Sequence, residues 1–333
     1  MSSVSCRFSK SLRCLAALAA IICAVPGAAL AADGFPSGPI RLIVPFPPGG
    51  GGDISGRLFA QELEKRLKQS VIVDNRAGAN GKIGVQAAMA APKDGQTLLL
   101  ATVSTHSTEP DLYGAKPPYD PVNDFAPVAL INNMSMVLVV NPSVPVTTMA
   151  EFVALARKSP GSITYASAGL GNIGHLTMEL FLREAGLKLT HVPYKGAADA
   201  VRDLLAGNVN TFFDVYPSEL PHIKSGRVRP LAVSLTSRVP QTPEIPTTRE
   251  AGFPNVVSSA WTGIVAPRGT PPEVVARLNA EANAILAGEA FQSGMRDRGF
   301  VAAEPNTPEQ FKAFIEAETR KWSRLQRDIG LVK

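Results

Sequence analysis

The chain alternates between short unbroken apolar runs and longer segments whose apolar residues recur every three or four positions. The run from Ile40 to Val44 is continuous, as in a buried strand, whereas residues 54–68 carry apolar side chains at helical spacing. Between them lies the stretch from Pro45 to Asp53, which contains four consecutive glycines. The pattern therefore predicts a strand, a glycine loop and a helix in succession.

Four glycines in a row, Gly49 to Gly52, favour a site for an anion. Glycine lets the backbone approach a ligand closely, and the first turn of the next helix offers unpaired N–H groups at the positive end of its dipole. A Walker loop is excluded because Asp53 stands where its lysine would be, and a dinucleotide loop is excluded because residue 54 is not glycine. The alternatives are a plain turn and a site for an anion other than a nucleotide.

The alternation continues with strands at 71–74 and 97–102 around a helix at 82–90. Alternating strands and helices predict a parallel sheet with helices on both faces. Ligands of such sheets bind beyond the carboxyl ends of the strands. The hydroxyl-rich loop at 104–110 belongs to that edge and is either a capped, solvated turn or part of a binding site.

A second unit of the same design begins near residue 132. A capping box of Thr148 and Glu151 opens a helix to Lys158. A strand at 163–166 is then followed by a second glycine loop, Ser167 to His175, which leads into another helix. Further strands and a helix complete this unit at 189–193, 197–206, 209–214 and 231–235.

Prolines at 240, 243, 246 and 254 rule out regular structure in the next stretch, because proline lacks the N–H group and restricts its predecessor. We interpret this stretch as the return to the first unit. A strand at 261–266 follows, and capping boxes at Thr270 and Thr307 predict two more helices. The predicted organisation is lobe one at 32–131 and 240–333, and lobe two at 132–239.

Residues 1–31 have the pattern of a cleaved secretory signal, with a basic start, an apolar run and the small residues Ala29 and Ala31. The apolar run is shorter than the roughly 20 residues that span a bilayer. We therefore expect export to the periplasm. All three cysteines, Cys6, Cys14 and Cys23, lie in this segment, so we expect no disulfide and no cysteine metal site in the mature chain.

The charge balance excludes a nucleic-acid partner. The signal contains three basic residues and no acidic one, and its removal leaves 30 basic against 28 acidic residues, scattered along the chain. The mature chain of roughly 300 residues is near the size at which single cores divide, which favours two lobes.

The order and spacing of several segments resemble one family of periplasmic solute receptors. The matching segments are Pro45 to Asp53, Asp74 to Gly81, Ser104 to His106, Tyr119 to Val128, Tyr165 to Ser167, His191 to Gly196 and Trp261 with Ala266 to Pro271. The chain is similar to the substrate-binding proteins of tripartite tricarboxylate transporters, the Bug or TctC family. The resemblance implies a two-lobe α/β binding protein of the type II kind, with a ligand cleft between the lobes, that acts without a cofactor.

The resemblance also implies a partner and a site. A small organic carboxylate or acidic amino acid would be held by backbone N–H groups at the two loop-to-helix starts and passed to membrane permease subunits, and we expect a monomer. Carried onto this chain, the ligand-binding residues are Phe46, Gly50, Gly51, Gly52, Asp53, Ser104, His106, Ser167, Gly169, Gly171 and Asn172. Family members often carry Thr or Ser in the first loop, where this chain has only glycine before Asp53.

Four residues have competing interpretations. We interpret Asp53 as a helix N-cap rather than a ligand contact, because a carboxylate facing a carboxylate would repel it. Asp214 either meets an ammonium group of the ligand or caps a strand end. We interpret His175 as neutral and structural, because it lies in the first turn of a helix. Lys195 is either a surface residue or a partner of a distal carboxylate.

Two other functions compete with a receptor for transport. A secreted hydrolase could use Ser104 or Ser167 with His106 or His175, but no G-x-S-x-G elbow is present. A receptor that serves a signalling partner would need the same ligand-driven closure as a transport receptor, so the sequence does not separate the two. The four histidines have no metal-ligand spacing, and we expect no metal site.

Overall fold

The computed structural model describes residues 34–108, 118–194 and 196–332. The predicted signal with its three cysteines, the end of the hydroxyl-rich loop and Lys195 lie outside these residues. The chain divides into two compact units, 1–35 and 36–333, and only the second is described below.

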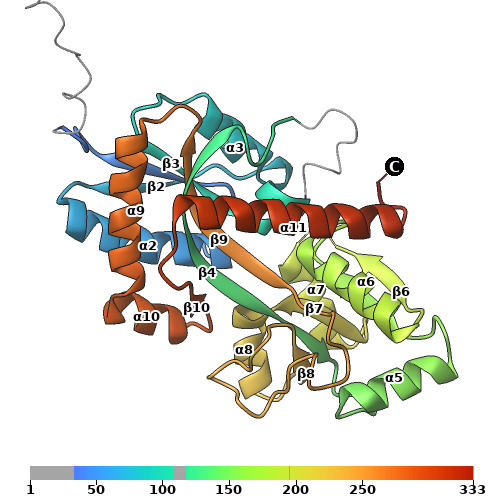
Figure 1. Ribbon diagram of the computed structural model, residues 1–333. Helices are drawn as coiled ribbons and strands as arrows, with labels where there is room; N and C mark the ends of the chain where they lie inside the picture. Colours follow the sequence, from blue (N-terminus) through green and yellow to red (C-terminus); the bar gives the residue numbers. More distant parts are fainter. Residues whose placement is uncertain (1–33, 109–117, 195, 333) are drawn as a thin grey trace, which may run out of the picture. The chain divides into compact units, whose positions relative to one another are not determined.

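Lobe one is built on the strand order β2-β1-β3-β9-β4 (Figure 1). Strand β1 is parallel to β2 and β3, whereas β9 runs antiparallel to both β3 and β4. The sheet is therefore mixed rather than wholly parallel. Its elements are β1 (Ile40–Val44), α2 (Gly51–Leu67), β2 (Val71–Asn75), η1 (Ala79–Gly81), α3 (Lys82–Met89), β3 (Thr97–Thr102), η2 (Ser104–Thr108), β9 (Ser259–Pro267), α9 (Pro272–Leu286), α10 (Glu289–Arg296) and β10 (Val301–Ala302).

Strand β4 (Phe125–Val140) belongs to both lobes. Its first part, as far as Ser135, pairs with β9, and two of its residues also pair with β10. From Met136 onward it pairs with β7 and β8 of lobe two. One continuous strand thus connects the two lobes and turns two sheets into one curled sheet.

Lobe two continues in the order β4-β7-β5-β6, with β8 also paired to β4. Strand β5 is parallel to β6 and β7, so the carboxyl ends of these three strands meet at one edge. The elements are α5 (Met149–Lys158), β5 (Thr164–Ser167), α6 (Ile173–Ala185), β6 (Thr190–Pro193), α7 (Ala197–Ala206), β7 (Thr211–Val215), α8 (Tyr216–Lys224) and β8 (Arg229–Val233).

The last helix, α11 (Pro308–Asp328), runs across both lobes (Figure 1). In lobe one, the Thr319 hydroxyl donates to the carbonyl of His106 and the Gln326 amide donates to the carbonyl of Thr108. In lobe two, Asp328 forms an ion pair with Arg183 of α6, with 2.9 Å between Oδ2 and Nη1. The helix therefore contacts each lobe through side chains of its own.

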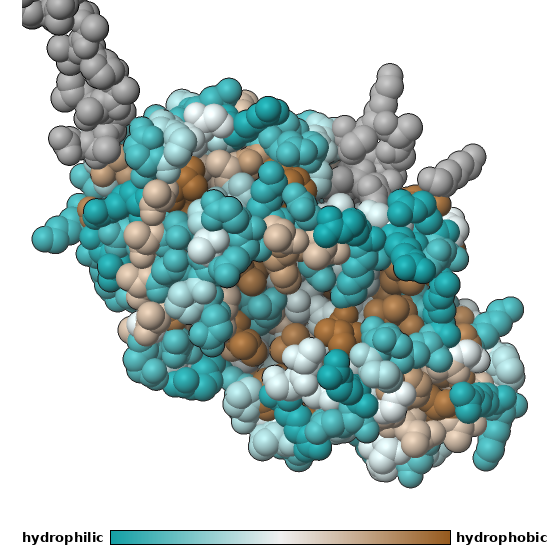
Figure 2. Space-filling view, viewed as in Figure 1, coloured by the Kyte–Doolittle hydropathy of each residue, from teal (hydrophilic) through white to brown (hydrophobic). Residues whose placement is uncertain are grey.

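Apolar side chains fill the space between sheet and helices. In lobe two, Phe212, Tyr216 and Leu204 belong to one buried cluster between β7, α7 and α8. Figure 2 shows polar atoms over the outer helical faces and apolar atoms along the middle of the same face, where the lobes meet. Burial of this kind is the dominant favourable term in folding.

Most predicted elements are present, and the capping boxes at Thr148 and Thr307 are confirmed. The capping box at Thr270 is wrong, because Pro271 is the N-cap of α9 and the Thr270 hydroxyl donates to Pro267 instead. Helix α8 was not predicted. Its Pro217 lies in the first turn, where a missing N–H costs nothing, so proline there does not break the helix.

Candidate functional site

The first glycine loop ends earlier than the sequence predicts, because α2 begins at Gly51 with Gly50 as its N-cap. Gly50 is exposed, while Phe46, Gly51 and Gly52 are half-buried. The N–H groups of Gly51 and Gly52 donate to no acceptor among the residues that the structure describes. The start of α2 thus offers backbone donors at its positive end.

Asp53 holds this loop in shape but is not the helix N-cap, so that interpretation is wrong. It is buried in the first turn, where its Oδ2 accepts from the backbone N–H of Gly49 and from Arg57, both at 2.9 Å. Its Oδ1 accepts from the Asn75 amide at 2.8 Å. Burial alone would raise the pKa of Asp53, but the hydrogen bonds from Arg57, Gly49 and Asn75 outweigh it and lower that pKa. The ionised carboxylate is occupied by the loop itself.

The second glycine-rich turn of lobe one packs against the first loop. A Cβ atom at Gly84 would lie 2.8 Å from Cα of Pro45, closer than any side chain allows. Glycine at this position therefore lets α3 approach the start of the loop. The Asn75 amide adds to this support by donating to the carbonyl of Phe46 at 3.0 Å.

The hydroxyl-rich stretch at 104–108 is a buried turn of π-helix, not a solvated turn. Ser104 is half-buried, but His106 is fully buried and packs on the rings of Phe125 and Trp261. His106 Nδ1 is bonded to the Thr105 hydroxyl at 2.8 Å, and burial lowers the pKa of His106 to about 3. A neutral ring behind the surface is placed to support the loop, and its ligand contact stays a prediction.

In lobe two, Ser167 at the end of β5 is bonded to His191 of the neighbouring strand β6, with 2.7 Å between Oγ and Nε2. The same hydroxyl also accepts from the N–H of Gly169 at 3.3 Å. The partner of Ser167 is therefore His191, not the His106 or His175 of the predicted hydrolase alternative. The pairing of β6 with β5 places His191 beside Tyr165, two residues before Ser167. This register cannot be read from the sequence alone.

Asn172 caps α6 and His175 closes the loop around it. The Asn172 Oδ1 accepts from the backbone N–H of His175 at 2.8 Å, and His175 Nδ1 accepts from the N–H of Gly171 at 3.1 Å. Because Nδ1 accepts, it carries no proton, and burial lowers the pKa of His175 to about 4. The structure thus agrees with a neutral, structural His175 and leaves the N–H groups of Ile173 and Gly174 without an acceptor among the described residues.

Three rings stack behind this second loop. The His191 ring stacks on both Tyr165 and His175, with ring centroids 4.6 Å and 4.3 Å away. Burial and the neighbouring His175 lower the pKa of His191 to about 4. The Tyr165 hydroxyl donates to Glu179, which also lies 4.0 Å from His175. The stack fixes the loop and keeps both histidines neutral.

Asp214 lies elsewhere, in a cavity of lobe two between α7 and α8. No hydrogen bond or ion pair of the described residues joins it to either glycine loop. Burial raises the pKa of Asp214 to about 7, and the carboxyl of Glu219, also buried, has its pKa raised to about 8 by burial and by Asp214. Glu219 was not identified from the sequence, where nothing local distinguishes a buried acid from one at the surface.

Within the described residues, no cluster of three or more His, Cys, Asp or Glu side chains could hold a metal ion. The described helices include none that is both long and apolar enough to cross a membrane. The polar groups that the two loops present are backbone N–H groups and neutral side chains, and neither loop contains Lys or Arg.

Two lobes that share a strand, each with a strand, a glycine loop and a helix start, define a two-lobe binding protein of the periplasmic type. Residues 56–331 match the model of the tripartite tricarboxylate transporter family receptors, and the chain belongs to this family. The predicted resemblance and fold class are therefore confirmed. Members of this family are periplasmic solute-binding receptors.

Relatives of the chain include both sequences and solved structures. Protein BugT of Bordetella pertussis is 36% identical over 318 residues, which cover 95% of this chain and 97% of BugT. The structure of R. palustris Rpa4515 with adipate has a TM-score of 0.81 at 36% identity and covers 90% of this chain and 99% of its own. MatC from Rhodopseudomonas palustris, with bound malate, has a TM-score of 0.76 at 30% identity and covers 87% and 99%.

Proposed function

We propose that this protein is a periplasmic receptor that captures a small carboxylate between its two glycine loops and has no catalytic activity. The observation that carries the proposal is the pair of helix starts, α2 and α6, whose N–H groups have no acceptor among the described residues. Such groups bind carboxylates without a cationic side chain. Adipate and malate in related structures support this class of ligand.

The proposed ligand contacts are the backbone donors of Gly50 to Gly52 in lobe one and those of Ile173 and Gly174 in lobe two. Ser167 and Asn172 position the second loop through their bonds to His191 and His175. Since one loop comes from each lobe, a ligand that bound both would favour the closed form over the open form. Family membership supports delivery of the carboxylate to permease subunits of a tripartite transporter.

The test removes one donor without removing the loop. Gly50 has the extended backbone that a following proline requires, and proline is accepted in the first helical position, so Gly51→Pro deletes only one N–H group. Gly51→Ala is the matched control, because it adds a Cβ atom at the same place but keeps the N–H group. The close neighbour of that Cβ atom is the flexible Met134 side chain at 3.0 Å, and Phe300 lies at an ordinary contact distance of 3.8 Å.

We expect calorimetry to identify a binder among dicarboxylates, tricarboxylates and acidic amino acids. Gly51→Pro should then lower the affinity for that compound at least tenfold, since a hydrogen bond to a charged group contributes about 1.5 kcal/mol or more. Gly51→Ala should bind within a few-fold of the parent. Equal loss in both variants, or no binder in the whole series, would contradict the proposal.

A hydrolase is the second candidate, because the bond between Ser167 and His191 has the length that a nucleophile and its base would have. Against it, Ser167 has no exposed surface and the neutral His191 stacks on the rings of Tyr165 and His175. Turnover of an ester or amide that disappears in Ser167→Ala would favour the hydrolase. Binding without turnover would favour the receptor. Uptake of the carboxylate by cells with and without this protein would separate transport from signalling.

A further inference from the structure

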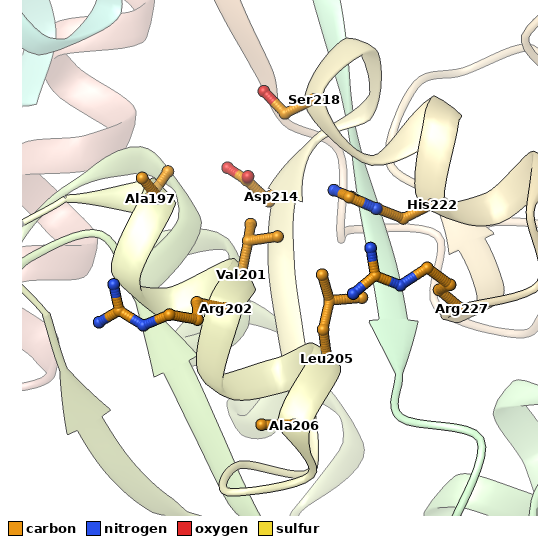
Figure 3. Close-up of a pocket in the computed structure, with 10 residues that line it drawn as sticks. Ala197, Val201, Arg202, Leu205, Ala206, Asp214, Ser218, His222 and Arg227 are labelled. Carbon is orange, nitrogen blue, oxygen red and sulfur yellow. The ribbon is translucent and has the colours of Figure 1, made fainter.

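Lobe two contains a cavity of about 630 Å³ that the carboxylate receptor does not use (Figure 3). It lies between α7 and α8, and β7 contributes Asp214 to its lining. Its apolar wall consists of Ala197, Val201 and Leu205, on one side of α7. The volume lies within the range of small-molecule sites, whose walls are mostly apolar with a few polar groups.

A buried acid stands at one end of this cavity. Asp214 is 6% exposed and its Oδ2 has no hydrogen-bond partner within the described part of the chain. Figure 3 shows its carboxyl group between the first turn of α7, at Ala197, and the first turn of α8, at Ser218. A buried carboxyl without a partner is costly, and the usual compensation is a partner of opposite charge or a bound donor.

Glu219 adds to the demand for a partner. It is fully buried, and both of its carboxyl oxygens lack a hydrogen-bond partner among the described residues. Burial raises the pKa of both acids, and the Asp214 carboxyl raises the pKa of Glu219 further. A cation at Asp214 would relieve this repulsion directly.

Basic groups stand at the other end of the cavity. Figure 3 shows the His222 ring and the Arg227 guanidinium directed into the space beside Leu205, whereas Arg202 points away. Arg202 is already paired with Asp199 at 2.8 Å. The side chain of Arg227 makes no hydrogen bond or ion pair within the described residues, so its guanidinium is available to an anion. Burial and Arg227 lower the pKa of His222, which leaves Arg227 as the main positive charge.

An acid at one end, a guanidinium at the other and an apolar wall between them select a ligand with two opposite charges. A plain carboxylate would leave the buried Asp214 without a partner, and a plain amine would leave Arg227 without one. We propose that this cavity is a second ligand site, which binds a short amino carboxylate with its ammonium group at Asp214 and its carboxylate at Arg227. This site is independent of the two glycine loops.

The experiment is calorimetric titration of the mature protein with 5-aminopentanoate, and with pentanoate and pentylammonium as probes that keep only one charge. We expect 5-aminopentanoate to bind at least tenfold more tightly than either probe. Asp214→Asn and Arg227→Gln should each weaken it about tenfold or more. Glu244→Gln and Lys224→Gln are the controls. Each removes one exposed charge of the same sign outside the cavity and should leave the affinity for 5-aminopentanoate within twofold.

Two further measurements keep the outcome clear. Arg227 is exposed, so Arg227→Gln should fold even if Asp214→Asn does not, and a melting curve at pH 8 checks both. Gly51→Pro should weaken the binding of the carboxylate at the glycine loops but not the binding of 5-aminopentanoate. The proposed function and the second site can therefore be contradicted independently of each other. Unchanged affinity in Arg227→Gln, absence of binding to the parent protein, or equal binding of pentanoate would overturn the proposal.

Discussion

Single side chains in this protein mostly serve the loops rather than a ligand. Asp53, His106 and His175 all lie in or beside the predicted binding loops, and each is buried and bonded to the backbone or a side chain of its own loop or its neighbours. The residue types could be read from the sequence, but their partners could not. Asp53 meets Asn75, and Ser167 meets His191, across gaps of 22 and 24 residues that only the fold closes.

The two buried histidines of the second loop predict a loss of stability at acidic pH. His175 and His191 have pKa values of about 4 in the fold and an ordinary value of 6.5, so the unfolded chain binds more protons between these values. Stability should therefore fall as pH drops from about 6.5 toward 4, by up to about 1.4 kcal/mol per pH unit for each histidine, with no such effect above neutrality.

Melting curves from pH 4 to 8 on the parent and on His191→Gln check this expectation. The variant should lose less stability than the parent over the acidic window. Asp214 and Glu219 act in the opposite sense, because their raised pKa values make folding bind protons, so their contribution falls as pH rises toward 8. That trend should be the same in both proteins. A parent and a variant with equal slopes below pH 6.5 would contradict the assignment.

At the scale of elements, sequence signals succeeded where local chemistry decides the structure. The capping boxes of α5 and α11 could be predicted because the N-cap threonine and its Glu or Gln partner lie three residues apart in the sequence. Helix α8 was missed because its two prolines indicate irregular structure, and tertiary packing of Tyr216 and Leu220 in the lobe-two core overrides that signal. For the long β4, the sequence indicates a strand only at the apolar run from Met136 to Val140, since the earlier part mixes polar residues with apolar ones.

The cap of α5 gives a test at this scale. Thr148 accepts from the N–H of Glu151 at 3.2 Å, and Thr148→Ala should lower the free energy of unfolding by about 1 kcal/mol. Thr148→Ser keeps the hydroxyl and should lose much less. Denaturant titrations of the three proteins measure the difference, and equal stabilities for Ala and Ser would show that the cap contributes nothing.

At the scale of the described unit, the two lobes share β4 and α11 and should unfold together. Both tryptophans, Trp261 of β9 and Trp322 of α11, report on lobe one or on the last helix. Thr148→Ala, which lies in lobe two, should therefore shift the fluorescence transition and the circular-dichroism transition by the same amount. Two separate transitions, with the fluorescence unmoved, would mean that the lobes unfold independently.

Helix α11 also restricts how the lobes can move. It is a rod of about 32 Å at 1.5 Å per residue. Its side chains bond to η2 of lobe one, and its last residue bonds to Arg183 of lobe two. A rod attached at two places can pivot but cannot lengthen, so the lobes cannot simply separate along its axis. The remaining motion is a rotation of one lobe about the axis of the helix. During this rotation the half-exposed ion pair of Arg183 and Asp328 is the contact whose loss costs least.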